Sequence, residues 1–410
     1  MNPAKRMIAV LAATIAAAIA VPAGAGLPEP DEPKPLWHID LRSQGLTHNS
    51  MGIFMFSSHD HPDSSRNRNA VSINSNGQVA VVFAAFQERN GDGYEPGTAK
   101  LHLLVYEAAT GKQIGTKEWL APKASEIVDN PAISTTFDGN FLLEYAGQLA
   151  LYSPSLQFIR SAEIEAERLP LWYWTSPDGR YAFFSRKKDQ INVLTIVDTE
   201  TLQVLRSVNP GSSIVAASSR YLAVWRFPNQ RDTTSRSLDV RSNNSEWEQI
   251  YSDDCPPKYR AGIGFLPTYS VGVGFLTDPV LIASSCNKLV IVDVEHKILF
   301  SQTFFKGQTM DSSAQSFSSS ADGERFALAV DQPKRDPWWT GDPGTGPVPV
   351  RLLVYDTSIS DRAIASFELH GNHPSDYDRL SFALSPDGAS LVLIRDTNLE
   401  FVRLPLRQAH

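Results

Sequence analysis

Two polar segments place histidines beside acidic residues, in a pattern that could bind a metal. The first reads HDH and the second HGNHPSDYD. Their imidazoles belong to His59, His61, His370 and His373. Imidazole nitrogens and carboxylates are ligands for zinc and other transition metals. A divalent metal held there would support hydrolysis, whereas the alternative is a pair of solvated loops whose histidines only form local hydrogen bonds.

A pair of adjacent tryptophans, Trp338 and Trp339, lies in a segment rich in proline and glycine. Aromatic rings on a loop can stack on a sugar, a peptide or a partner surface. The alternative is that one ring packs back onto the protein. Trp338 and Trp339, with the four histidines, are therefore candidate ligand-binding residues. NGDGYEPG around Asp92 lacks the alternating ligands and the distal Glu of a calcium loop, so we expect a hairpin tip there.

Motifs for other kinds of chemistry are missing from the sequence. It has no Gly-x-Ser-x-Gly elbow, no phosphate-cradling glycine loop, no haem-attachment motif and no dinucleotide fingerprint. Catalytic residues therefore stay unassigned, and no cofactor is predicted beyond the possible divalent metal. The formal net charge of −8 argues against a nucleic-acid partner or an anionic membrane surface.

The N-terminus has the three parts of a secretory signal peptide. MNPAKR is basic, MIAVLAATIAAAIAV is apolar and uncharged, and Ala23-Gly24-Ala25 matches a small-x-small cleavage site. The apolar run is shorter than the roughly 20 residues of a membrane span. We expect residues 1–25 to be removed near Ala25, which leaves a periplasmic or secreted chain without a transmembrane segment. Residues 26–35 are proline-rich and predict a tether.

The two cysteines, Cys255 and Cys286, fit that compartment. An even count in an exported protein favours a disulfide, and two buried thiols are the alternative. The bridge would close a loop of about 31 residues, which is worth roughly 3 kcal/mol in the chain-entropy model.

A repeated turn in the sequence predicts the β-strands that would carry these residues. Asn-Gly or Asp-Gly stands between apolar runs in SINSNGQVAVVF, STTFDGNFLLEY, TSPDGRYAFFSR, SSADGERFALAV and LSPDGASLVLIR. Such a dipeptide is the strongest short hairpin signal, because glycine accepts a positive φ without steric cost. AASSRYLAVWRF and GFLTDPVLIASS are degenerate copies, so the sequence holds seven.

Each copy is followed by a second hairpin, and Asp198, Asp293 and Asp356 occupy one equivalent turn position in three of these hairpins. A short carboxylate there accepts backbone N–H bonds of its own turn, so we expect a structural role for these three. Four short strands per repeat are typical of propeller blades. Trp172-Tyr173-Trp174 leads directly into a first strand, and we expect it to pack between blades.

The predicted fold is therefore an all-β, seven-bladed propeller of four-stranded antiparallel blades over residues 36–410. The last repeat is one strand short, and LWHIDL at residues 36–41 has strand character. We expect this N-terminal strand to complete the last blade, because an open ring would leave sheet edges exposed.

The S-x-DG turn and the strands ending in IVDT and VYDT resemble the repeats of seven-bladed propellers of the YVTN and WD40-like superfamily. The resemblance covers nearly the whole mature chain, although the Gly-His and Trp-Asp signature of true WD40 blades is absent. Exported bacterial members include lactonases, subunits of quinoprotein dehydrogenases and binding proteins, so the resemblance implies the fold and leaves the function open.

In a propeller of antiparallel blades, the connections between strands lie on two opposite faces. Connections between blades, and between second and third strands, leave one face, which we call the top face; the others leave the opposite, bottom face. The long segments 45–69, 87–100, 227–237 and 331–350 all fall on the top face. Binding sites concentrate on loops carried by a rigid scaffold. We therefore expect a monomeric, non-catalytic propeller that binds a protein, peptide or glycan there. The alternatives are a metal-assisted hydrolase or lactonase at the channel mouth, and a redox-complex subunit.

Overall fold

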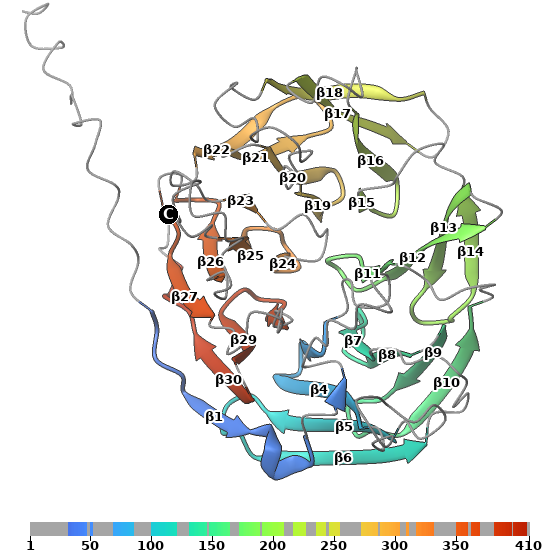
Figure 1. The fold of residues 1–410 in the computed structure, drawn as a ribbon, viewed down its shortest axis with the longest axis vertical. Coiled ribbons are helices and arrows are strands. Elements are labelled where there is room, and N and C mark those ends of the chain that lie inside the picture. The colour runs from blue at the N-terminus through green and yellow to red at the C-terminus, as the bar shows by residue number, and fades with distance from the viewer. Residues whose placement is uncertain are drawn as a thin grey trace, which may run out of the picture.

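A computed structural model of the chain describes most of residues 32–407. The described ranges are 32–46, 50–51, 69–85, 100–120, 131–145, 147–164, 172–188, 191–208, 216–226, 235–242, 246–254, 272–285, 288–303, 309–310, 317–331, 350–359, 362–369, 381–395 and 397–407. Within them the chain folds into seven antiparallel sheets arranged as blades in a ring around a central axis (Figure 1). The seven-bladed prediction is confirmed.

Blades 1 to 4 follow one another along the chain. Blade 1 holds β2 (Ser50–Met51), β3 (Val71–Ile73), β4 (Gln78–Ala85), β5 (Lys100–Glu107) and β6 (Gln113–Leu120). Blade 2 holds β7 (Ala132–Thr135), β8 (Phe141–Tyr145), β9 (Gln148–Tyr152) and β10 (Phe158–Glu163). Blade 3 holds β11 (Trp172–Thr175), β12 (Tyr181–Lys188), β13 (Ile191–Asp198) and β14 (Val204–Val208). Blade 4 holds β15 (Ala216–Ala217), β16 (Tyr221–Arg226), β17 (Ser235–Ser242) and β18 (Glu248–Asp254).

Blades 5 to 7 complete the ring. Blade 5 holds β19 (Gly272–Thr277), β20 (Val280–Ser285), β21 (Lys288–Asp293) and β22 (Ile298–Thr303). Blade 6 holds β23 (Thr309–Met310), β24 (Phe317–Ser319), β25 (Arg325–Asp331), β26 (Val350–Asp356) and β27 (Ala365–Leu369). Blade 7 holds β28 (Phe382–Leu384), β29 (Ser390–Arg395), β30 (Asn398–Arg403) and β1 (Trp37–Asp40).

The N-terminal strand closes the ring as predicted. β1 pairs antiparallel with β30, in the register Trp37↔Phe401 to Asp40↔Asn398 (Figure 1). The Trp37 ring stacks on Phe401 at 5.4 Å, and its indole N–H donates to the Ala108 carbonyl at 2.7 Å. Since Ala108 follows the third strand of blade 1, a single side chain joins the last blade to the first.

Part of the predicted tether is bound to the propeller. The Glu32 carboxylate accepts a hydrogen bond from Arg395 at 2.6 Å, and the backbone N–H of Leu36 donates to Phe401 at 2.8 Å. The chain is therefore held along blade 7 from Glu32 onward, four residues before the predicted strand. A short 3-10 helix, Leu41–Gln44, follows β1. Within the described ranges, no helix is both long and apolar enough to cross a membrane.

The repeated turns form as the sequence predicts. Gly77, Gly139, Gly179, Gly323 and Gly388 all have a φ between 67° and 77°, the left-handed region that glycine favours. In the SPDG turn of blade 3, for example, Gly179 N–H donates to the Ser176 carbonyl at 2.8 Å. The turn aspartates of the second hairpins are also structural. The backbone bonds that they accept come from Thr201 to Asp198, from Lys297 to Asp293, and from Ser358 to Asp356.

The core lies between neighbouring blades. One buried cluster joins blade 7 to blade 1 and another joins blade 2 to blade 3, with Tyr173 in the second. Trp174 packs against the cluster between blades 3 and 4. The predicted packing of this aromatic segment between blades is thus confirmed for Tyr173 and Trp174. A buried ion pair adds a polar link between blades, because Arg325 binds Asp356 at 2.9 Å and also donates to the Gly388 carbonyl of blade 7.

The inner strands of blades 1 and 6 are interrupted, which the sequence did not predict. β2 pairs with Ala84–Ala85 of β4, and β3 pairs with Val79–Val81 of the same strand. β2 and β3, which residues 52–70 separate in the sequence, therefore form one inner strand, whereas we expected 45–69 to be one connection into blade 1. In blade 6, β23 and β24 likewise share β25 on either side of residues 311–316.

Candidate functional site

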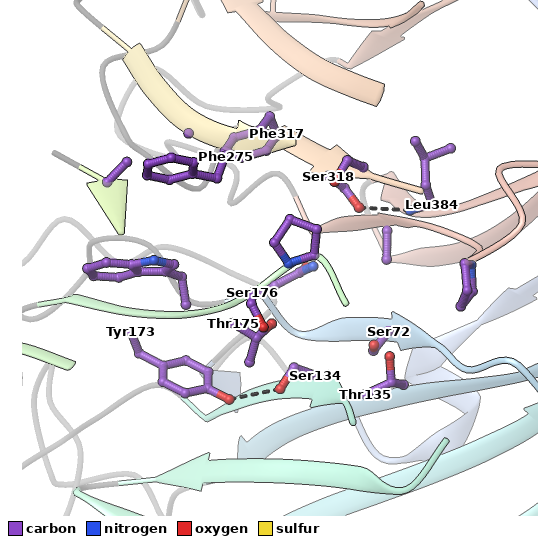
Figure 2. A pocket seen from close by; sticks show the side chains of 18 of the residues that line it. Ser72, Ser134, Thr135, Tyr173, Thr175, Ser176, Phe275, Phe317, Ser318 and Leu384 are labelled. Carbon is purple, nitrogen blue, oxygen red and sulfur yellow. Dashed lines mark hydrogen bonds between the residues drawn. The ribbon is translucent and has the colours of Figure 1, made fainter. Parts of the chain in front are cut away.

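A pocket of about 180 Å³ occupies the central channel. Its lining comes from the first strand of every blade, namely β3, β7, β11, β15, β19, β24 and β28. The lining also includes Pro177 and Pro386 of two SPDG turns, so the pocket extends toward the bottom face. Innermost strands converge on the propeller axis, and the side chains that point toward the axis therefore meet there (Figure 2).

One side of this channel pocket carries hydroxyl groups. Ser72, Ser134 and Thr135 come from blades 1 and 2, and Thr175 extends the series into blade 3 (Figure 2). Ser134 shares a hydrogen bond of 2.8 Å with the Tyr173 hydroxyl. Within the described part of the chain, by contrast, the hydroxyls of Ser72 and Thr175 make no hydrogen bond to another protein group. They can both donate to and accept from a molecule in the pocket.

The blade 6 strand adds two further hydroxyls. Ser318 accepts the backbone N–H of Leu384 at 3.0 Å through its oxygen, which leaves its own proton free to donate (Figure 2). Ser319 lines the pocket beside it and has no protein partner among the residues that the structure describes. Ser176 differs, because its hydroxyl is used within its own turn, where it donates to Asp178 at 2.5 Å.

The other side of the channel pocket is aromatic. Figure 2 shows the rings of Phe275 and Phe317 across the pocket from Ser72 and Thr135. Trp174 also lines the pocket, and its ring stacks on Phe183 at 5.5 Å. Trp174 and Phe317 are both partly exposed, whereas Phe275 is 3% exposed. The pocket therefore offers accessible ring surface both opposite and beside free hydroxyls.

Charged side chains are absent from the described lining, which has Tyr173 as its titratable group. Among the described residues, no group of three or more His, Cys, Asp or Glu side chains is placed to hold a metal. The chemistry of this pocket is therefore that of neutral hydrogen bonding and ring stacking.

The residues predicted from sequence as site residues all lie outside the described ranges. They are His59, His61, His370, His373, Trp338 and Trp339, together with the predicted disulfide partners Cys255 and Cys286. The Asp92 segment lies outside them as well. These assignments stay predictions.

The described ends of the two histidine segments are nevertheless adjacent. Asn69 follows residues 52–68 and Ser381 follows residues 370–380. The Asn69 side chain donates to the Phe382 carbonyl at 2.7 Å, and the Ala70 N–H donates to the Ser381 hydroxyl at 3.1 Å. The described residues that follow the two segments therefore lie at the same junction, between blades 7 and 1.

The channel pocket itself was missed in the sequence, although a signal for it exists. Ser or Thr stands within or directly after most first strands, as in VSI, AIST, WYWT and FSS. Strands buried on both faces are expected to be continuously apolar, so hydroxyls at equivalent positions in successive repeats indicate a shared polar cavity.

Comparison with known proteins adds little beyond the fold. No family model matches the chain, and no curated protein sequence matches it. Among solved structures, a chain in a crystal structure of the mitotic checkpoint complex is similar over 93% of this chain and 98% of its own length. The two are 13% identical, with a TM-score of 0.47.

Proposed function

We propose that this protein is an exported, non-catalytic binding propeller that holds a protein, peptide or glycan on its top face. One observation supports the proposal: the described strand ends on that face are the ones between which the longest segments of the sequence lie. Residues 86–99, 255–271 and 332–349 all join strand ends there, whereas the longest connection on the bottom face covers residues 357–364.

The scaffold that carries these connections is a closed ring. Blade 7 is completed by β1, and buried clusters join successive blades. A closed ring fixes where every connection starts and ends, which is how recognition loops are positioned on stable folds. The signal-peptide pattern at residues 1–25 supports an extracytoplasmic place of action.

Screening the full chain against defined glycan and peptide arrays tests the proposal. We expect a bound ligand whose affinity falls at least tenfold when Trp338 and Trp339 are both replaced by Ala, because aromatic anchors carry much of an interface's binding energy. Phe137→Ala is the matched control, since Phe137 is 58% exposed on a bottom turn. Binding lost in the control but retained in the double variant would contradict the proposal.

Export and catalysis need separate measurements. N-terminal sequencing of the chain from the extracytoplasmic fraction should begin near Gly26. Elemental analysis, repeated after His59, His61, His370 and His373 are replaced by Ala, tests the metal-assisted hydrolase. Stoichiometric metal lost in that variant, together with turnover of the bound ligand, would replace a binding role by an enzymatic one.

A further inference from the structure

From the channel pocket we infer a second binding site, which takes one ring of an uncharged sugar. This inference concerns the axis of the propeller and its described residues, so it stands apart from the proposed top-face site. It rests on three features of the pocket: the absence of charged side chains from its described lining, its combination of rings with free hydroxyls, and its size.

The absence of charged side chains from the described lining selects an uncharged ligand. The described lining has no Lys, Arg, His, Asp or Glu. Burying a charged group there would remove its hydration without supplying a partner, which is costly. The net charge of −8, or −10 once Lys5 and Arg6 leave with the predicted signal peptide, further disfavours an anionic ligand. A neutral molecule fits the pocket best.

Ring surface with hydroxyls around it selects a ligand that is apolar on one face and rich in hydroxyls at its edge. Trp174 and Phe317 present partly exposed rings, and an apolar face that covers them is removed from water. Ser72, Thr175 and Ser319 present hydroxyls without a protein partner among the described residues. Each of these groups can donate and accept at once, as can each hydroxyl of a sugar. A pyranose ring has this combination of C–H face and hydroxyl edge.

The size limits the ligand to about one ring. The pocket volume of about 180 Å³ lies below the roughly 300–1,000 Å³ of pockets that hold drug-sized ligands. This volume is enough for a single hexose, whereas a second residue of a longer glycan would have to leave the pocket along the axis.

The chain keeps the aromatic side in place by means of a glycine. A Cβ built on Gly274 would lie 1.9 Å from Cε1 of Phe317, so the Phe317 ring occupies the space that any other residue at 274 would need. Gly274→Ala should displace this ring without altering a hydroxyl group, which makes it a test of the aromatic side alone.

The test uses the full chain with glucose, galactose, mannose and N-acetylglucosamine, measured by calorimetry and ligand-observed NMR. Glucuronic acid serves as the charged comparison and uncharged tripeptides as the peptide comparison. We expect binding of at least one neutral sugar, weakened about tenfold or more by Thr175→Val and by Gly274→Ala. Thr195→Val is the matched control, because Thr195 lies in the same blade outside the pocket and bonds to Ser207. Circular dichroism confirms that each variant folds.

Each outcome decides the inference. Neutral-sugar binding that falls in the two pocket variants and persists in the control supports it. Three results would overturn it. The first is sugar binding that neither pocket variant changes, and the second is binding of tripeptides instead of sugars with the same variant pattern. The third is no binding of any probe. None of these results affects the top-face proposal, which depends on Trp338 and Trp339 and is lost only if the array screen or its double variant fails.

Discussion

At the scale of single residues, His102 illustrates how a predicted strand buries an ionisable group. It lies on β5 of blade 1, is 6% exposed, and stacks on Phe83 at 4.7 Å. Its Nδ1 is 3.2 Å from a Glu118 carboxylate oxygen, outside hydrogen-bond geometry. Burial lowers the pKa of His102 below 6.5. The Glu118 carboxylate raises this pKa and the Lys100 ammonium lowers it, but burial has the largest effect.

This lowered pKa predicts a loss of stability in acid. Since the folded state disfavours protonated His102, the unfolded chain binds the proton more readily below about pH 6.5. The stabilising contribution of neutral His102 is therefore complete above that pH and declines as the pH falls toward the folded-state pKa. Urea unfolding between pH 7.5 and 5 should show a steeper fall in unfolding free energy for the parent than for His102→Gln.

NMR titration of the folded protein checks the cause. The pKa of His102 should lie below 6.5 in the parent and fall further in Glu118→Gln, which removes the carboxylate that raises it. The Glu118 side chain is 43% exposed and lies outside the buried core, so we expect this substitution to leave the core packing intact. A His102 pKa at or above 6.5 would contradict the burial argument.

At the scale of elements, the turns were predictable because their chemistry is local. An Asp-Gly or Asn-Gly pair needs only its own backbone to select a positive φ, and all five such glycines adopt it. The interrupted inner strands of blades 1 and 6 were not predictable in the same way. The sequence shows no local signal that Ser50–Met51 pairs with Ala84–Ala85 before the chain leaves and returns at Val71.

Two of these glycines have the same φ but different surroundings, so they allow the cost of the φ to be measured apart from the cost of a tertiary contact. Gly77 and Gly179 both have a φ of 70°, and a Cβ on Gly77 would meet nothing within 4 Å. A Cβ on Gly179 would lie 2.6 Å from the Thr135 carbonyl oxygen in blade 2, which is backbone and cannot rotate away. Gly77→Ala should therefore cost about 1–2 kcal/mol for its φ alone. Gly179→Ala should cost roughly 2–5 kcal/mol, because overpacking is added.

Chemical denaturation of the two variants measures the difference. A larger loss for Gly179→Ala at an unchanged m-value would locate the extra cost in the contact between blades 2 and 3. Equal losses would show that blade 2 moves away from the new methyl group at no cost.

At the scale of the whole molecule, the sequence predicts the architecture better than the site. Seven repeats and an unpaired N-terminal strand require a closed ring, since edge strands left open are exposed to aggregation. The channel pocket depends instead on residues from seven separate strands, such as Ser72, Thr175 and Phe317, which meet only once the ring has closed. No spacing along the chain encodes that meeting, so the sequence predicts site residues in the histidine and tryptophan segments and does not predict the pocket hydroxyls.

Closure also makes a prediction about the whole ring. A chain that starts at residue 41 lacks β1, so it exposes the edge of β30 and loses the Trp37 contacts with Phe401 and Ala108. A chain that starts at Glu32 keeps β1 and the bond from Arg395 to Glu32. We expect the shorter chain to aggregate or to unfold at lower urea, because the edge of β30 is exposed while Trp37 and Ile39 no longer pack against the cluster between blades 7 and 1.

Trp37→Ala in the longer chain isolates the side-chain part of this closure. Removing a partly buried ring with its hydrogen bond should cost roughly 2–4 kcal/mol while the strand pairing remains. Size-exclusion chromatography and urea unfolding of the three proteins should therefore rank them: longer chain, then Trp37→Ala, then the chain without β1. If the chain without β1 matched the longer chain in both measurements, the ring would be stable when open, and neither the channel pocket nor the fixed top face could be attributed to closure by β1.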